Sequence, residues 1–289
     1  MNNLGILSLL LLFPSLWLLL KRSAPRDSPA QILAYAVRSL GQRPVRVYFL
    51  SLLSVLAVDV ALTALDAHFT AIVGHDYAAE ILRLEGRTVA FVQAWSSPPA
   101  VRLFFVWVYV VVYPLLFLQL ILVLHRQGET TALLRFARAF VLNYVLALPF
   151  YLFFPVTEVG HIEGSGATPI LDAWFPEFMK AGRNFSGIDN CFPSLHTSLS
   201  VTAAVVALAS SNRALRWTTG IFAGLIALST MVLGIHWVAD VAAGVPFGAL
   251  CAWLGTKVGR NVQGLDHVRR VGDALPRDVE GRPVDHRDA

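Results

Sequence analysis

The chain has 289 residues, of which 56% are hydrophobic and 15% are charged, and its mean hydropathy is +0.60. This composition excludes an ordinary soluble globule and predicts a protein embedded in a membrane. The net charge of +4 and the pI of about 9.3 do not indicate a nucleic-acid-binding protein, because the basic residues lie in short segments between long apolar runs.

The apolar runs predict helices that cross a membrane, since about 20 residues are needed to span a hydrocarbon core about 30 Å thick. A first run covers residues 4–20 and is followed by Lys21 and Arg22, a pattern typical of a retained anchor rather than a cleaved signal peptide. Further spans are predicted at about residues 47–66, 101–124, 135–154, 193–210, 215–234 and 236–256. The predicted fold class is therefore all-α and integral to the membrane, with about seven transmembrane helices.

These runs divide the chain into three regions. Residues 1–46 form an N-terminal anchor and a basic loop, residues 47–256 form a membrane core of six helices, and residues 257–289 form a tail. The tail mixes charges with glycine and proline and has little apolar periodicity, which predicts a mobile segment. The second span contains Asp59, which we expect to be a structural carboxyl group, protonated or hydrogen-bonded locally.

Lysine and arginine are distributed unevenly between the two sides of the predicted membrane domain. Without the tail, 11 of them lie on the side of residues 21–46 and five on the other side, so the positive-inside rule assigns the first side to the cytoplasm. On the outer side, residues 77–95 have the pattern of an amphipathic helix lying on the membrane. Residues 155–193 form a long loop, which predicts a lid or rim over a substrate site.

Two short stretches place a histidine where a polar loop meets an apolar run on that outer side. The first stretch runs from Cys191 to His196, and its Pro-Ser pair predicts the start of a helix, where free N–H groups attract an anion such as phosphate. The second runs from Ser229 to Asp240, and it holds His236 four residues before that aspartate. On a helix the two would be neighbours, so the carboxylate can orient the imidazole and leave its other nitrogen as a nucleophile.

Two alternatives exist for this histidine and aspartate. They could be an ordinary polar pair at a helix end, or they could bind a metal ion. No third ligand lies at helical spacing beside them, although His68, His75 and His161 share the outer side. Both stretches at the same face of a membrane instead favour phosphoryl transfer through a phosphohistidine, a reaction that needs neither a metal nor a cofactor.

The two stretches resemble the second and third signatures of the type 2 phosphatidic acid phosphatase superfamily, whose members are membrane enzymes with a six-helix core. Pro193-Ser194-Leu195-His196 is similar to the family's Pro-Ser-Gly-His, and Ser229, Thr230, His236 and Asp240 match its Ser-Arg, His and Asp pattern. The resemblance implies that His236 is the nucleophile, that Asp240 orients it, and that His196 is the acid that protonates the leaving group. It also implies that residues 47–256 are the six-helix core.

Three departures from the family pattern concern its phosphate-binding groups. Leu195 replaces a glycine, Thr230 replaces an arginine, and no lysine of the chain fits the first signature, Lys followed after six residues by Arg-Pro. These features are similar to the branch that contains inositol phosphorylceramide synthases, which transfer a headgroup between lipids. We expect Lys180 and Arg183 to replace the missing basic groups, although each could equally be a solvated loop charge. Further substrate contacts are expected from Asn190, Ser194 and Thr230.

Three functions are compatible with these residues. With water as acceptor the protein would be a lipid phosphate phosphatase, which is favoured narrowly because water is always present at the membrane boundary. With an alcohol lipid as acceptor it would be a phosphotransferase that moves a phospho-headgroup. A transporter or lipid-binding protein is disfavoured, because a transporter needs polar residues near the middle of the membrane. The expected partners are a lipid phosphate and membrane lipids, without nucleic acid, and the expected site opens on the extracytoplasmic face.

Overall fold

The computed structural model describes residues 29–42, isolated positions between 45 and 57, residues 72–183 and residues 187–274. The predicted first span, nearly all of the second span with Asp59, and the end of the tail lie outside the described residues. The described elements are α2 (Pro29–Leu40), α4 (Ala78–Glu85), α5 (Thr88–Trp95), α6 (Pro99–Trp107), the π-helix η1 (Val108–Val112), α7 (Tyr113–Arg126), α8 (Thr130–Phe153), the 3₁₀-helix η2 (Val159–His161), α9 (Ile170–Trp174), α10 (Pro176–Gly182), α11 (Leu195–Ala207), α12 (Arg213–Val232) and α13 (Val238–Ala274).

Among the described residues, four helical runs are long and apolar enough to cross a membrane. They are Pro99–Arg126, Thr130–Phe153, Arg213–Val232 and Val238–Lys257. Each agrees to within about six residues with a span that the hydropathy pattern predicts. The prediction of an all-α integral membrane protein is therefore confirmed.

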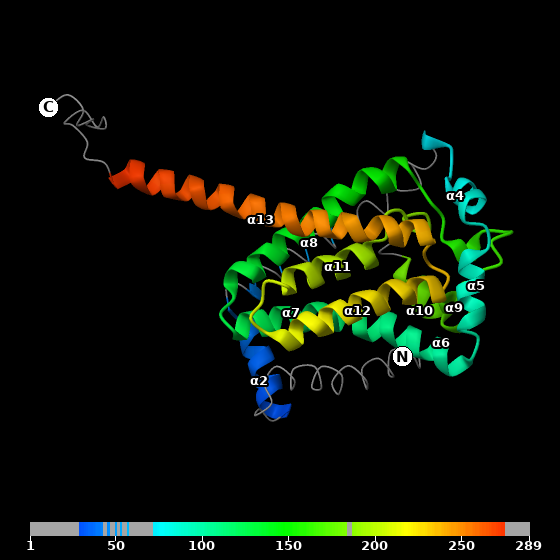
Figure 1. Cartoon of the computed structure of the whole chain (residues 1–289), viewed down its shortest axis with the longest axis horizontal. Helices are drawn as coiled ribbons and strands as arrows, with labels where there is room; N and C mark the ends of the chain where they lie inside the picture. Colours follow the sequence, from blue (N-terminus) through cyan, green and yellow to red (C-terminus); the bar gives the residue numbers. More distant parts are fainter. Residues whose placement is uncertain are drawn as a thin grey trace.

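The helix α11 is shorter than the span predicted at residues 193–210. It has 13 residues, which rise only about 20 Å, less than the hydrocarbon core of about 30 Å. It lies among α8, α12 and α13 (Figure 1), so protein rather than lipid surrounds it. Polar groups are satisfied there: Thr202 Oγ1 donates to Gly248 O over 2.9 Å and accepts from Asn143 Nδ2 over 2.9 Å. A short, hydroxyl-rich helix is stable in such a position.

Helices α11 and α13 approach each other backbone to backbone. A Cβ atom on Gly248 would lie 2.1 Å from the carbonyl oxygen of Ser198, and one on Gly244 would lie 2.8 Å from that of Ser194. Any larger residue would force the helices apart, which is the usual role of small residues four apart in membrane helices. This contact brings the beginnings of the two helices together.

The run from α6 through η1 to α7 is one continuous helix that widens in the middle. Pro114 has no N–H to donate to the carbonyl of Val110, and the chain forms a π-helical turn just before it. This turn contains Tyr109 and is followed by Tyr113. Both tyrosine rings lie against His196.

The helices α4, α5, α9 and α10 gather at the end of the bundle where α13 begins (Figure 1). The segment 77–95 was predicted as one amphipathic helix, but it consists of α4 and α5, separated at Gly86, whose φ of +59° ends the first helix. Its apolar side chains Leu84, Phe91 and Trp95 are exposed. The predicted long loop carries η2, α9 and α10.

The last helix is longer than the sequence predicts. α13 passes Lys257, where the mobile tail was expected to begin, and continues to Ala274. The sequence explains the extension, because after Pro246 the next helix-breaking proline is Pro276.

Candidate active site

His236 and Asp240 form a buried hydrogen-bonded pair at the start of α13. The Nδ1 atom of His236 lies 3.2 Å from Oδ2 of Asp240, and the same oxygen accepts the backbone N–H of Trp237 over 2.9 Å. The exposed fractions of the two side chains are 4% and 0%. Because the carboxylate binds Nδ1, Nε2 is the imidazole nitrogen that remains for chemistry.

His196 faces His236 from the first turn of α11. The centroids of the two imidazole rings are 5.7 Å apart. The rings of Tyr109 and Tyr113 each lie 4.8 Å from the ring of His196 and fix its position from the side of the π-helical turn. The three residues predicted to be catalytic, His196, His236 and Asp240, therefore lie together.

Both histidines line a cavity of about 300 Å³, a volume at the lower end of the range for small-molecule sites. The cavity combines an aromatic wall, an apolar wall and a small polar group. The tyrosines are Tyr109, Tyr113, Tyr144 and Tyr151; the apolar residues include Phe178, Met179, Leu195 and Ile235; the polar ones besides the histidines are Glu158, Arg183 and Asn190. The cavity therefore offers both an apolar surface and charged groups beside the two histidines.

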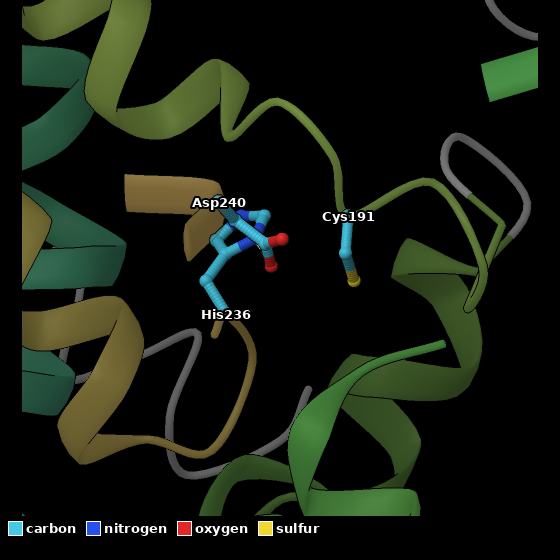
Figure 2. A group of neighbouring side chains, drawn as sticks. All are labelled: Cys191, His236 and Asp240. Carbon is cyan, nitrogen blue, oxygen red and sulfur yellow. Dashed lines mark hydrogen bonds and ion pairs between the residues drawn. The ribbon is translucent and has the colours of Figure 1, made fainter. Parts of the chain in front are cut away.

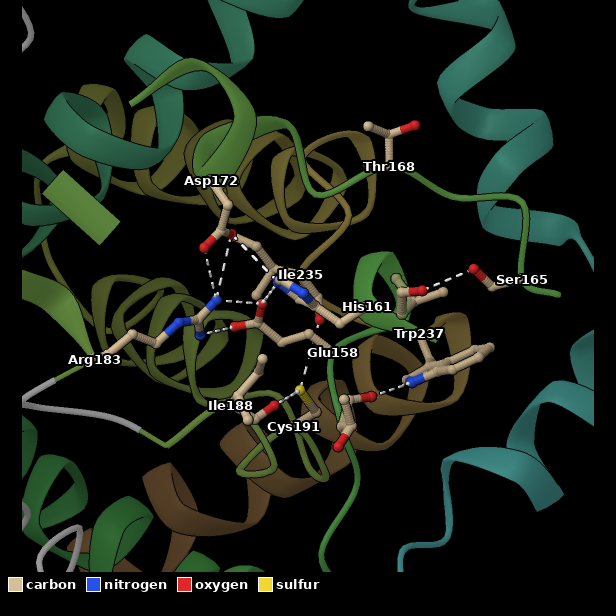
Figure 3. Close-up of polar contacts among 12 residues, drawn as sticks. Glu158, His161, Ser165, Thr168, Asp172, Arg183, Ile188, Cys191, Ile235 and Trp237 are labelled. Atoms are coloured by element: carbon tan, nitrogen blue, oxygen red, sulfur yellow. Dashed lines mark hydrogen bonds and ion pairs between the residues drawn. The ribbon is translucent and has the colours of Figure 1, made fainter. Parts of the chain in front are cut away.

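Arg183 provides a positive charge to this cavity and is held by two carboxylates (Figure 3). Its Nη1 donates to Glu158 Oε1 over 2.5 Å and its Nη2 donates to Oε2 over 2.8 Å, while Asp172 accepts from Nη2 at 3.4 and 3.5 Å. Burial alone would lower the pKa of the guanidinium, but the hydrogen bonds and charges of Glu158 and Asp172 raise that pKa above its usual value. Arg183 is therefore permanently charged and has a fixed orientation.

Lys180 and Asn190 differ in their relation to the cavity. Lys180 is exposed and is not among the described residues that line it. Asn190 does line it, and its side-chain oxygen is buried without a hydrogen-bond partner in the described part of the chain. The basic pair proposed from the sequence is thus divided, with Arg183 in the cavity and Lys180 outside it.

Ser194 and Thr230 lie in the framework of the site rather than on its surface. The Ser194 side chain caps α11 by accepting the N–H of Thr197 over 3.3 Å, and it is fully buried. The Thr230 hydroxyl donates to the carbonyl of Ala227 over 2.8 Å, and its own carbonyl accepts the N–H of His236 over 3.3 Å. Both residues were predicted to contact the substrate, but neither lines the cavity. The hydroxyl of each is engaged by the backbone of its own helix.

Several residues of the site were not found from the sequence. They are Glu158, Asp172 and the four tyrosines. The one local signal was Pro114, which predicts a defect in the helix that carries Tyr109. The other residues lie in irregular segments or on different helices, where no spacing in the sequence marks them.

In the part of the chain that the structure describes, two groups of side chains have donor atoms close enough to share a metal ion. Cys191, His236 and Asp240 form the first (Figure 2), with donor atoms within 4.8 Å of one another. Burial, together with the carboxylates of Asp240 and Glu158, raises the pKa of the Cys191 thiol. The second group is Glu158, His161 and Asp172, whose carboxylates already bind the guanidinium of Arg183.

Comparison with known proteins agrees with this geometry. The PAP2 superfamily model matches residues 79–254, which is more than half of the chain. No curated protein and no solved structure matches the chain significantly. The matched range begins in α4, ends in α13 and includes His196, His236 and Asp240. The chain therefore belongs to the PAP2 superfamily.

Proposed function

We propose that this protein is a membrane-embedded enzyme that removes the phosphoryl group from a lipid phosphate through a phosphohistidine on His236. Membership of the PAP2 superfamily supports phosphoryl transfer on lipid phosphates in general. The observation that carries the specific proposal is the cavity shared by His196 and His236, with Nδ1 of His236 bound to Asp240 over 3.2 Å.

In the first step, Nε2 of His236 attacks the phosphorus atom. A P–N bond forms, the P–O bond to the lipid alcohol breaks, and His196 in its protonated form gives its proton to the leaving oxygen. Asp240 keeps the imidazole in the correct tautomer and stabilises the positive charge that develops on it. In the second step His196 accepts a proton from the attacking water, the P–N bond breaks, and inorganic phosphate leaves.

The phosphate would be bound by Arg183 and by the first turn of α11. Two of the donors on the guanidinium face Glu158 and a third faces Asp172, whereas a guanidinium has five donors in all. The Ser194 cap satisfies the N–H of Thr197, whereas the N–H groups of Leu195 and His196 precede the first intrahelical bond. These groups and the helix dipole attract an anion. We assign no phosphate contact to Lys180.

Transfer to an alcohol lipid is the second candidate. It is supported by the apolar residues Phe178, Met179, Leu195 and Ile235, which would shield a phosphohistidine from water. Transfer is also supported by Leu195 and Thr230, which stand in place of the family's glycine and arginine and resemble the branch that contains inositol phosphorylceramide synthases. Hydrolysis remains the first candidate, because water is always present at the membrane boundary where the proposed site lies.

The test uses the purified full-length protein in detergent with a phosphate-labelled lipid phosphate. Hydrolysis predicts release of inorganic phosphate with no added acceptor. Release of label only after an alcohol lipid is supplied, with the label found in that lipid, would favour transfer and contradict hydrolysis. No turnover under either condition, against a panel of lipid phosphates and phosphodiesters, would contradict both.

We further propose that the site opens on the extracytoplasmic face. The two helix beginnings that carry the histidines lie at the end of the bundle with fewer basic loop residues. The opposite end carries the basic loops around Arg126, Arg213 and Arg216.

A further inference from the structure

The loop that carries the nucleophile is held at its first end by a buried glutamine of α5. The Nε2 group of Gln93 donates to the carbonyl of Val232, the last residue of α12, over 3.1 Å, and to the carbonyl of Thr168 over 2.8 Å. Its Oε1 accepts the N–H of Thr168 over 2.8 Å. Gln93 is only 4% exposed. The point where the chain leaves α12 is therefore fixed to α5.

The second end of the same loop is held by a glutamate of α4. The carboxylate of Glu85 accepts the backbone N–H of Val238 over 2.9 Å and also that of Ala239. These are the first two residues of α13. A negative charge at this position also interacts favourably with the helix dipole.

This glutamate supplies half of a helix cap that the local sequence lacks. The residue before α13 is Trp237, which has no side-chain oxygen to accept N–H groups of the first turn. Asp240 performs the reciprocal part of a capping box by accepting the N–H of Trp237 over 2.9 Å. Glu85 provides the remaining acceptor from a helix that is distant in the sequence.

We propose that α4 and α5 form a clamp on the loop Leu233–Trp237, in which Glu85 and Gln93 are positioning residues for His236 and Asp240. Neither side chain lines the cavity among the described residues, so each acts through the backbone. Asp240 is in the first turn of α13, so any rotation of that turn moves its carboxylate relative to Nδ1 of His236. Such a displacement matters, since a shift of about 1 Å at reacting groups can cost about 100-fold in rate.

The kinetic test rests on the proposed function and compares Glu85→Ala, Glu85→Gln and Gln93→Leu with a control, Glu80→Gln. Glu80 is a carboxylate on the same helix that pairs with His75 and Arg83. Glu85→Ala should lower kcat by up to about 100-fold while KM for the lipid phosphate changes little, because binding groups stay in place. Glu85→Gln keeps one acceptor and should lose less, and Glu80→Gln should match the wild type. Wild-type kcat in Glu85→Ala and Gln93→Leu, or a loss carried by KM alone, would overturn the proposal.

A second measurement does not depend on the substrate, so a failure of the clamp can be separated from a failure of the proposed function. Amide hydrogen exchange reports the N–H groups of Val238 and Ala239 directly. In Glu85→Ala these amides should exchange faster, and the change should be confined to the loop and the first turn of α13. Unchanged exchange there would overturn the clamp. Equal loss of protection in every helix, in both Glu85 variants, would also overturn it by making Glu85 a general stabilising residue.

Discussion

The backbone N–H of Ser194 donates a hydrogen bond to the carbonyl oxygen of Asp240 over 3.1 Å. This bond connects the residue that caps α11 to Asp240, the residue of α13 that is hydrogen-bonded to His236. His196 follows Ser194 by two residues, and His236 is bound to the side chain of the same aspartate. These two hydrogen bonds connect the segments that carry the two histidines, and they restrict how far one histidine can move relative to the other.

Replacement of the proposed nucleophile should abolish turnover. His236→Ala removes the nitrogen that would accept the phosphoryl group. Asp240→Asn keeps the imidazole ring but removes the charge that would stabilise the imidazolium, so we expect kcat of Asp240→Asn to fall by about 100-fold or more. Activity and trapping of radiolabelled phosphate on the protein provide the measurement. His75→Ala, in an exposed histidine that pairs with Glu80, is the matched control. Near wild-type activity in folded His236→Ala would rule out the phosphohistidine.

His196 should matter most for substrates with poor leaving groups. A general acid is typically worth about 10²–10⁴-fold, and it is needed most when the leaving oxygen is an alkoxide. His196→Ala should therefore lose far more activity toward an alkyl lipid phosphate than toward an aryl phosphate. The two substrates are compared as the ratio of their kcat/KM values. An equal loss for both would assign His196 to another role.

Arg183 and Lys180 should separate in their effects, because only the arginine lines the cavity. Loss of one preorganised donor to transition-state charge costs about 10²–10³-fold in kcat. Arg183→Ala should reach that range, and Arg183→Lys should recover little, since a lysine cannot reproduce the paired contact with Glu158. Lys180→Ala is the control and should keep wild-type kinetics. Unchanged kinetics for Arg183→Ala would make Arg183 a structural ion pair.

Gly234 should not tolerate a side chain. Its φ is +76°, where a residue with a Cβ loses roughly 1–2 kcal/mol, and that Cβ would lie 2.3 Å from the backbone carbonyl of Thr168. Gly234→Ala should lower the melting temperature and the activity together, because the loop that carries His236 must move. The control is Gly220→Ala on α12, where nothing among the described residues lies within 4 Å of an added Cβ. There alanine favours the helix, so stability should stay or rise.

The orientation in the membrane can be tested with single cysteines at exposed positions. Glu163→Cys lies in the segment between α8 and α11, and Arg213→Cys lies at the start of α12, at the other end of the bundle. An impermeant thiol reagent added to intact cells should label the first and not the second. The native Cys191 and Cys251 are buried, which limits background labelling. The reverse pattern would place the site on the cytoplasmic side.

The sequence by itself determined the features that depend on local chemistry. Long apolar runs can be stable only in lipid or in a large core, so the spans α6–α7, α8, α12 and the first part of α13 follow from hydropathy. A histidine and an aspartate four residues apart can meet without any tertiary contact, which is why the pair of His236 and Asp240 could be predicted. The helix start after Pro193-Ser194 is local in the same way.

Only the tertiary structure decided which charged groups reach the cavity. Arg183 and Lys180 are neighbours in a loop, and hydropathy treats them alike, but Glu158 and Asp172 bind one of them and leave the other exposed. The length of α11 depends equally on its neighbours, since helices packed around it replace the lipid that would require a longer span.

The cap on α13 is the clearest case of a contact between residues that are distant in the sequence. Glu85 and Val238 are separated by 153 residues, and no spacing in the sequence relates them. A backbone N–H at a helix start donates to any anion that the fold brings within reach, so its partner is chosen by how α4 and α13 pack. The residues that perform the proposed chemistry are therefore encoded locally, whereas the charges that hold them in place are brought together only by folding.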